Sequence, residues 1–202
     1  MLVHIIDDDE SVCDSLTVLL RGEKFDTRTY RSASDFLASA DSRTPGCVVT
    51  DVRMPGMDGL ELMTAMKQRG LTLPVIVITG HGNVALAVKA MKGGALDFIE
   101  KPYSASALIE AVRHGCRSVS EAGKEFEHVD LLARGANIDK LSPREREVLG
   151  KVIDGLPNKV IAYEMGLSVR TVETHRAAIM MKTRAGSLAE LVRMCIAKEI
   201  SR

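Results

Sequence analysis

The sequence lacks clustered cysteines, a leader-like start and long apolar runs. Its four cysteines, at positions 13, 47, 116 and 195, are too widely scattered for a zinc site, so we expect reduced thiols in a cytosolic protein. The opening residues MLVHIIDDDE contain no basic segment, and no apolar run approaches the roughly 18 residues needed to span a bilayer. We therefore expect a cytoplasmic protein without a membrane partner.

The chain also lacks a net charge, because 27 basic residues balance 27 acidic ones. This balance hides an asymmetry, since residues 1–138 hold 15 basic and 19 acidic residues, whereas residues 139–202 hold 12 and 8. The two parts therefore carry net charges of −4 and +4. A chain of 202 residues has room for one large domain or two modest ones, and the basic part fits a polyanionic partner.

Short apolar segments alternate with helical patterns through the first part of the chain. We expect strands at 2–6, 24–30, 47–50, 74–79 and 96–100, and helices at 10–22, 34–40, 57–69, 83–93 and 104–117. This alternation predicts a doubly wound α/β sheet. The continuously apolar strands suit the interior of a parallel sheet, whereas the alternating segment 24–30 suits an edge. In the flavodoxin-like order 2-1-3-4-5, ligands bind outside the carboxyl ends of strands 1 and 3.

The stretch GCVVTDVRMPGMDG, residues 46–59, indicates which side chains occupy that position. Aspartate is a poor strand residue and the proline that follows turns the chain, so Asp51 is expected at the carboxyl end of a strand. The first strand ends in Asp7, Asp8 and Asp9, and the strand order brings these carboxylates toward Asp51. Clustered carboxylates must raise their pKa values or bind a cation. With oxygen ligands alone that cation is Mg²⁺, beside which a carboxylate can accept a phosphoryl group.

Two more polar residues follow strands at the same rim. Thr79 ends the strand at 74–79, and Lys101 comes directly after the strand at 96–100. A hydroxyl and an ammonium group there can hold two phosphoryl oxygens while Mg²⁺ holds the third. These residues therefore support the same phosphate chemistry as Asp51.

The first part of the chain resembles the receiver domain of two-component response regulators. The resemblance covers roughly residues 1–117 and is carried by Asp7, Asp8, Asp51, Thr79, Phe98 and the pair Lys101-Pro102. It implies that Asp51 is the phosphoacceptor, that Asp8 is the main carboxylate ligand of Mg²⁺ and that Asp7 assists through water. It also implies that Arg53 supplies its main-chain carbonyl to the metal.

The same resemblance implies a switch and a partner. A sensor histidine kinase would supply the phosphoryl group, and Thr79 and Lys101 would serve the transfer. Thr79 and Phe98 would form the switch pair. A phosphoryl group adds roughly −1.5 to −2 charges and shifts a two-state equilibrium. The receiver would catalyse only its own phosphotransfer and dephosphorylation, so we expect no enzyme acting on other substrates.

The rest of the chain predicts a linker and a second, all-α domain. Residues 118–138 are charged and weakly periodic, which indicates a partly helical linker. Four helical patterns follow within 139–202, at 143–153, 158–165, 169–183 and 187–199. The turn at 164–168 between two of these short helices has helix-turn-helix spacing.

The helix expected at 169–183 has one apolar face and one face of small and polar residues. At 100° per residue, Val172 and Ile179 point to the core, and the opposite face suits entry into a DNA major groove. There Arg170 can contact phosphate or guanine, Thr174 a thymine methyl and Glu173 a cytosine amino group. The residues assigned to phosphates lie on the flanks and are Lys159, Thr171, Arg176 and Lys182. The predicted DNA contacts are Lys159, Ser168, Arg170, Thr171, Glu173, Thr174, Arg176, Ala177 and Lys182.

Residues 139–200 resemble the LuxR/NarL-type helix-turn-helix through the segments LSPREREVL and NKVIAYEMGLSVRTVETH and through Lys182. Together with the receiver, the chain resembles a FixJ-type transcription regulator. The resemblance implies binding to double-stranded promoter DNA, a homodimer when phosphorylated, and RNA polymerase as a further partner. The last helix would be the dimerisation helix through Leu188, Leu191, Val192 and Cys195; the alternative is that this stripe packs on its own domain.

Two other functions compete with this interpretation. A hydrolase of the aspartyl-phosphate type would need a second carboxylate two residues after the nucleophile, where this chain has Arg53. A receiver-controlled protein-interaction module without sequence-specific DNA binding would leave the pattern from Arg170 to Ala177 unexplained.

Overall fold

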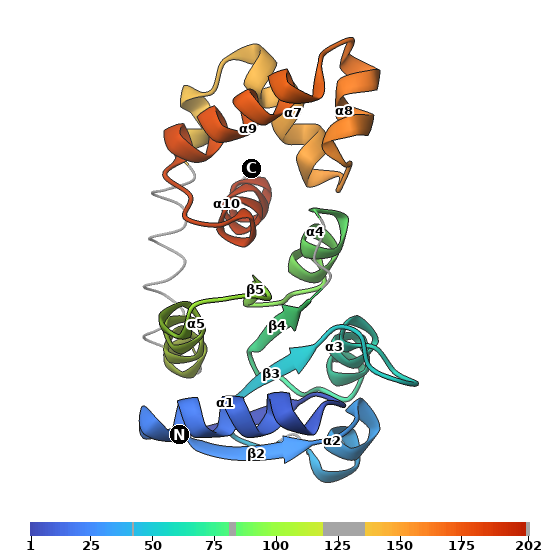
Figure 1. Cartoon of the computed structure of the whole chain (residues 1–202), viewed down its shortest axis with the longest axis vertical. Coiled ribbons are helices and arrows are strands. Elements are labelled where there is room, and N and C mark those ends of the chain that lie inside the picture. The colour runs from blue at the N-terminus through green and yellow to red at the C-terminus, as the bar shows by residue number, and fades with distance from the viewer. Residues whose placement is uncertain (42, 81–83, 119–135, 201–202) are drawn as a thin grey trace. The chain divides into compact units, whose positions relative to one another are not determined.

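The computed structural model describes residues 1–41, 43–80, 84–118 and 136–200. The chain forms two compact units, which we describe in turn; their elements are labelled in Figure 1. Among the described helices, none is both long enough and apolar enough to cross a membrane. All four cysteines are free thiols, as predicted.

The first unit is built on a parallel sheet of five strands. These are β1 (Leu2–Ile6), β2 (Asp26–Tyr30), β3 (Cys47–Asp51), β4 (Val75–Thr79) and β5 (Asp97–Glu100). Their order, β2-β1-β3-β4-β5, confirms the predicted topology with β2 at an edge. The strand predicted at 24–30 begins later, at Asp26, because Lys24 has a φ of 66° and ends the preceding helical turn.

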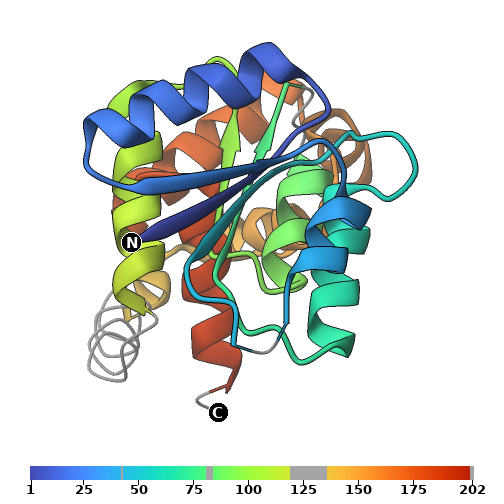
Figure 2. The same ribbon diagram turned by 90° about the horizontal axis from the view of Figure 1, so that it is seen from below.

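Five helices connect the strands: α1 (Glu10–Gly22), α2 (Ala33–Ser39), α3 (Gly59–Gln68), α4 (Val84–Lys92) and α5 (Ala105–Ser118). Helices α1 and α5 pack on one face of the sheet, where Leu16 and Leu108 meet Ile5 in a buried core. Figure 2 shows α2 and α3 on the opposite face. The sheet is therefore covered on both faces, which agrees with its continuously apolar strands.

Polar side chains begin these helices close to the rim of the sheet. The Asp9 carboxylate accepts from Ser11 N at 2.9 Å and caps α1. Asp58 and Glu61 form a capping box at the start of α3. The helix starts are thus set next to the strand ends that carry the predicted site residues.

The second unit contains the four helices predicted after the linker. They are α7 (Pro143–Ile153), α8 (Asn158–Met165), α9 (Val169–Thr183) and α10 (Leu188–Ile200). The bounds predicted for the first three are confirmed, and the fourth begins and ends one residue later than predicted. The turn between α8 and α9 contains Gly166 with a φ of 63°, which glycine adopts without strain.

The predicted linker lies largely outside the described residues. Helix α5 ends at Ser118, and a short 3-10 helix, η1, occupies Ala136–Lys140 before α7. The core of the second unit is apolar and is formed by α7, α8, α9 and α10 together with Leu141, for example by Val148, Ile161, Val172 and Met194.

We predict that Gly59→Ala destabilises the first unit. A Cβ atom at Gly59 would lie 2.4 Å from the main-chain oxygen of Asp51, so strand β3 or helix α3 must move. We expect a loss of about 3 kcal/mol in the free energy of unfolding, at the upper end for overpacked sites. Urea denaturation followed by circular dichroism measures it. Gly22→Ala is the matched control, since a Cβ there meets nothing within 4 Å; equal stabilities of the two variants would contradict the prediction.

Candidate functional site

The predicted site residues lie at the carboxyl rim of the sheet. Asp7 follows β1, Asp51 ends β3, Thr79 ends β4 and Lys101 follows β5. The main-chain N–H of Lys101 donates to the main-chain oxygen of Thr79 at 2.8 Å, which extends the β4–β5 pairing to the rim. Because all the strands are parallel, side chains distant in the sequence meet at one place.

Lys101 lies between the two carboxylates. Its Nζ is 3.2 Å from Asp7 Oδ2 and 3.0 Å from Asp51 Oδ1. The exposed fractions of the side chains are 6% for Asp7, 11% for Asp51 and 27% for Lys101. Water therefore screens these charges poorly, and the ion pairs are stronger than pairs on an open surface.

The second oxygen of each carboxylate accepts a main-chain N–H. Asp7 Oδ1 accepts from Asp9 N at 2.9 Å, and Asp51 Oδ2 accepts from Arg53 N at 2.6 Å. Each carboxylate is thus held by one ammonium contact and one amide contact. These two contacts fix the orientation of the Asp51 carboxylate at the end of β3.

Burial and charge act against each other on the titration of this cluster. Burial raises the pKa of Asp7, and the Asp9 N–H and the Lys101 ammonium offset this only in part. Burial lowers the pKa of Lys101, but Asp51 and then Asp7 outweigh it, so that this pKa is raised. Lys101 consequently carries its positive charge at neutral pH.

The donor atoms at the rim fit a hard cation. Within the described residues no three acidic, His or Cys side chains converge on a common metal position, so the structure joins Asp7 and Asp51 through Lys101 rather than forming the larger carboxylate cluster that we expected. Mg²⁺ usually keeps several waters and needs only one or two carboxylates. The oxygen-only donors of Asp7 and Asp51 therefore fit Mg²⁺.

Arg31 contacts the same rim and was not identified from the sequence. Its Nη2 donates to the main-chain oxygen of Asp8 at 2.8 Å, and its Nη1 donates to Glu10 at 2.9 Å. It comes directly after β2, the neighbour of β1. The predicted strand order contained this signal, because a residue after β2 lies at the same rim as one after β1.

The predicted switch residues lie on adjacent strands. Thr79 is fully buried at the end of β4, whereas Phe98 is half-buried on β5 opposite Val77. Their movement as a pair stays a prediction.

The second unit presents the predicted DNA-reading face on α9. Arg170, Glu173, Thr174 and Ala177 are all exposed. Ser168 caps the helix, since its Oγ accepts from Thr171 N at 3.0 Å. Lys159 on α8 and Met181 on α9 are exposed as well. The helical pattern therefore identified which side of α9 is free of the core.

Two cations assigned to phosphates have protein partners here. Arg176 Nη1 donates to Asn158 Oδ1 at 2.5 Å. Lys182 Nζ donates to both carboxylate oxygens of Glu145, at 2.7 and 2.8 Å. Their contacts with phosphates stay predictions.

The polar Thr183 on α9 and the apolar stripe of α10 both contact residues of their own unit. Thr183 is polar yet buried, and its Oγ1 donates to Ile179 O at 2.8 Å. On α10, Leu188, Leu191 and Cys195 pack against the core of their own unit. These contacts favour the alternative for the α10 stripe, and a dimerisation role for this helix stays a prediction.

Comparisons with known proteins agree with this geometry. The family described as "Response regulator receiver domain" matches residues 3–113, and "Bacterial regulatory proteins, luxR family" matches residues 139–195. The chain is 48% identical to the transcriptional regulatory protein FixJ of Azorhizobium caulinodans, over 96% of this chain and 91% of that one. It is 46% identical to FixJ of Rhizobium meliloti, over 96% and 95% of the two chains.

A solved structure extends the similarity to both parts of the chain. Full-length FixJ from B. japonicum has a TM-score of 0.59 and 44% sequence identity, and the match covers 98% of this chain and 97% of that one.

The contacts of Glu145 predict its titration. Lys182, then Ser142 N, lower the pKa of Glu145 to about 2. The stability that Glu145 contributes is therefore present above its unfolded pKa of about 4.3 and is lost as the pH falls through the folded value. We expect Lys182→Met to raise the pKa of Glu145, and the carboxyl ¹³C shift measures it.

Arg144→Met is the control for this titration, because Arg144 pairs with Glu147 instead. It should leave the pKa of Glu145 low. A wild-type Glu145 that titrates near its ordinary value would contradict the assignment of the Lys182 contact.

Proposed function

This chain belongs to the response regulators that join a receiver domain to a LuxR-family domain and regulate transcription in a phosphorylation-dependent way, and on that premise we propose that Asp51 accepts the controlling phosphoryl group. The observation that carries the proposal is the Lys101 ammonium held between Asp51 and Asp7. We place the receiver at 1–117, the linker at 118–138 and the DNA-binding domain at 139–202.

The transfer uses groups that the strand order brings to the rim. An oxygen of Asp51 forms a bond to phosphorus while the P–N bond of a phosphohistidine on the sensor kinase breaks. Lys101 and the hydroxyl of Thr79 then bind phosphoryl oxygens, and the Arg53 N–H lies beside the acceptor carboxylate. The protein thus positions fixed positive charge where negative charge gathers.

Asp8, Asp51 and the main-chain carbonyl of Arg53 are the residues that would hold Mg²⁺, with Asp7 assisting through water. When bound, this ion neutralises phosphoryl oxygens during transfer.

Phosphorylation then changes the output. The added charge at Asp51 shifts an equilibrium carried by Thr79 and Phe98 toward a form that pairs as a homodimer. Two DNA-binding domains reach half-sites about one helical turn apart, roughly 34 Å, and supply more phosphate contacts than one domain can. The bound dimer acts on RNA polymerase in the cytoplasm.

The DNA contacts follow from the exposed face of α9. Arg170, Glu173 and Thr174 read base edges and Ala177 allows close approach. The proposed phosphate contacts are Lys159, Ser168, Thr171 and Lys182, the last after exchanging Glu145 for phosphate. The two domains point to a regulator rather than to an enzyme acting on other substrates. The position where a hydrolase would need its second carboxylate holds Arg53.

The metal assignment distinguishes Asp8 from its neighbour Asp9. We predict that Asp8→Asn weakens Mg²⁺ binding more than about tenfold, because a ligand is lost. Asp9→Asn keeps a good helix cap and should bind Mg²⁺ within about threefold of wild type. Isothermal titration calorimetry measures both affinities. Equal losses in the two variants would count against Asp8 as the ligand.

The switch itself is tested on DNA. A binding site is first selected from genomic fragments with wild-type protein treated with acetyl phosphate and Mg²⁺. We expect the donor to raise the affinity of wild type for that site at least about tenfold and to produce a dimer in gel filtration. Asp51→Asn should show neither response, whereas Asp9→Asn should show both. Wild type that binds the site equally with and without donor would contradict control through Asp51.

A further inference from the structure

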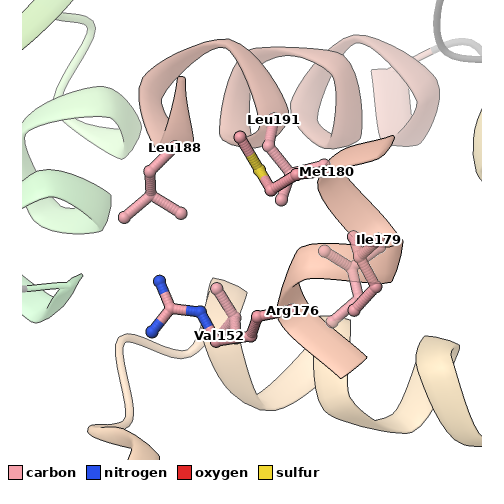
Figure 3. A pocket seen from close by; sticks show the side chains of 7 residues that line it. Val152, Arg176, Ile179, Met180, Leu188 and Leu191 are labelled. Atoms are coloured by element: carbon pink, nitrogen blue, oxygen red, sulfur yellow. The ribbon is translucent and has the colours of Figure 1, made fainter. Parts of the chain in front are cut away.

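Arg176 lies on the side of α9 that faces its own unit. It lines a small pocket with the apolar side chains of Leu149, Val152, Ile179, Met180, Leu188 and Leu191. Figure 3 shows the guanidinium beside Val152, with its stem running along the core. The DNA-reading residues Arg170, Thr174 and Ala177 are on the exposed side of the same helix. Arg176 is only partly exposed, unlike these residues.

The guanidinium of Arg176 has a specific partner on another helix. Its Nη1 donates to Oδ1 of Asn158 at 2.5 Å, and Asn158 is the first residue of α8. The start of α8 has no side-chain cap, since Pro157 occupies the N-cap position. The side-chain oxygen of Asn158 is therefore available to accept a hydrogen bond from α9.

This hydrogen bond complements the turn between the two helices. At the turn, Leu167 N donates to Ala162 O at 2.8 Å and Gly166 reverses the chain. The Arg176–Asn158 bond joins the opposite end of α8 to the middle of α9. The bond thus adds a polar connection at the far end of α8 to the turn and to the apolar core that Ile161 and Val172 share.

We propose that Arg176 and Asn158 are positioning residues that set the angle between α8 and α9, and thereby aim the DNA-reading face, without contact between Arg176 and phosphate. This proposal rests on the proposed DNA-binding function of the second unit. Burial also lowers the pKa of Arg176, as expected for a guanidinium partly removed from water. A hydrogen bond to a charged group contributes more to stability than one between neutral groups. The Arg176–Asn158 bond can therefore hold α8 against α9.

Two variants separate positioning from phosphate contact. Asn158→Ala removes the acceptor and keeps the arginine charge, and Arg176→Met removes the guanidinium and keeps an apolar stem in the pocket. Lys159→Ala on α8 is the control, because Lys159 is exposed and is one of the proposed phosphate contacts. The dissociation constant for the selected DNA site is measured at several salt concentrations. The temperature is one at which circular dichroism shows every full-length variant folded.

We expect Asn158→Ala and Arg176→Met each to weaken binding about tenfold, with the slope of log K against log salt unchanged. The double variant should lose little more than either single one. Lys159→Ala should lower that slope by about 0.9.

Other results would overturn the proposal. If Asn158→Ala binds as wild type while Arg176→Met lowers the salt slope, Arg176 contacts phosphate. If both variants lower the melting temperature but leave the affinity unchanged, their bond only stabilises the fold. Wild type that binds no DNA in any salt would instead refute the proposed function, and it is measured first.

Discussion

The ammonium group of Lys101 lies between two carboxylates that water screens poorly. Without it, Asp7 and Asp51 would face each other as like charges at the rim of the sheet. Three strands, β1, β3 and β5, must end at the same level for the three groups to meet, and the parallel register provides this. The site is therefore a consequence of the strand order, and its chemistry follows from which charges that order brings together.

The same contacts explain how a small modification can have a large effect. A phosphoryl group on Asp51, as proposed, would meet Lys101 and the Arg53 N–H, the donors that now hold the carboxylate. The main-chain N–H of Lys101 also donates a hydrogen bond to the main-chain oxygen of Thr79, at the end of the neighbouring strand. A redistribution of charge at the rim thus acts directly on the strands β4 and β5, which carry the proposed switch pair. The proposed DNA-reading face of the second unit is exposed.

Much of this could be predicted from the sequence because the signals were local. Ser142 and Glu145 mark the start of α7, and the apolar run that turns at Pro55 located Asp51 at the end of β3. Strand order places Arg31 at the rim but does not identify its partners, and the contact of Arg176 could not be predicted because no periodicity identifies Asn158. A helical pattern tells which side of α9 is inward, but it does not tell that an inward arginine finds Asn158.

The most direct test of the account is to locate the phosphoryl group. The protein is phosphorylated by acetyl phosphate with Mg²⁺, the acyl phosphate is reduced with borohydride, and the modified residue is identified by peptide mass spectrometry. The account predicts that homoserine replaces aspartate at position 51 in wild type and that the yield falls sharply in Lys101→Met. Modification at Asp7, Asp8 or elsewhere, with Asp51 intact, would contradict it.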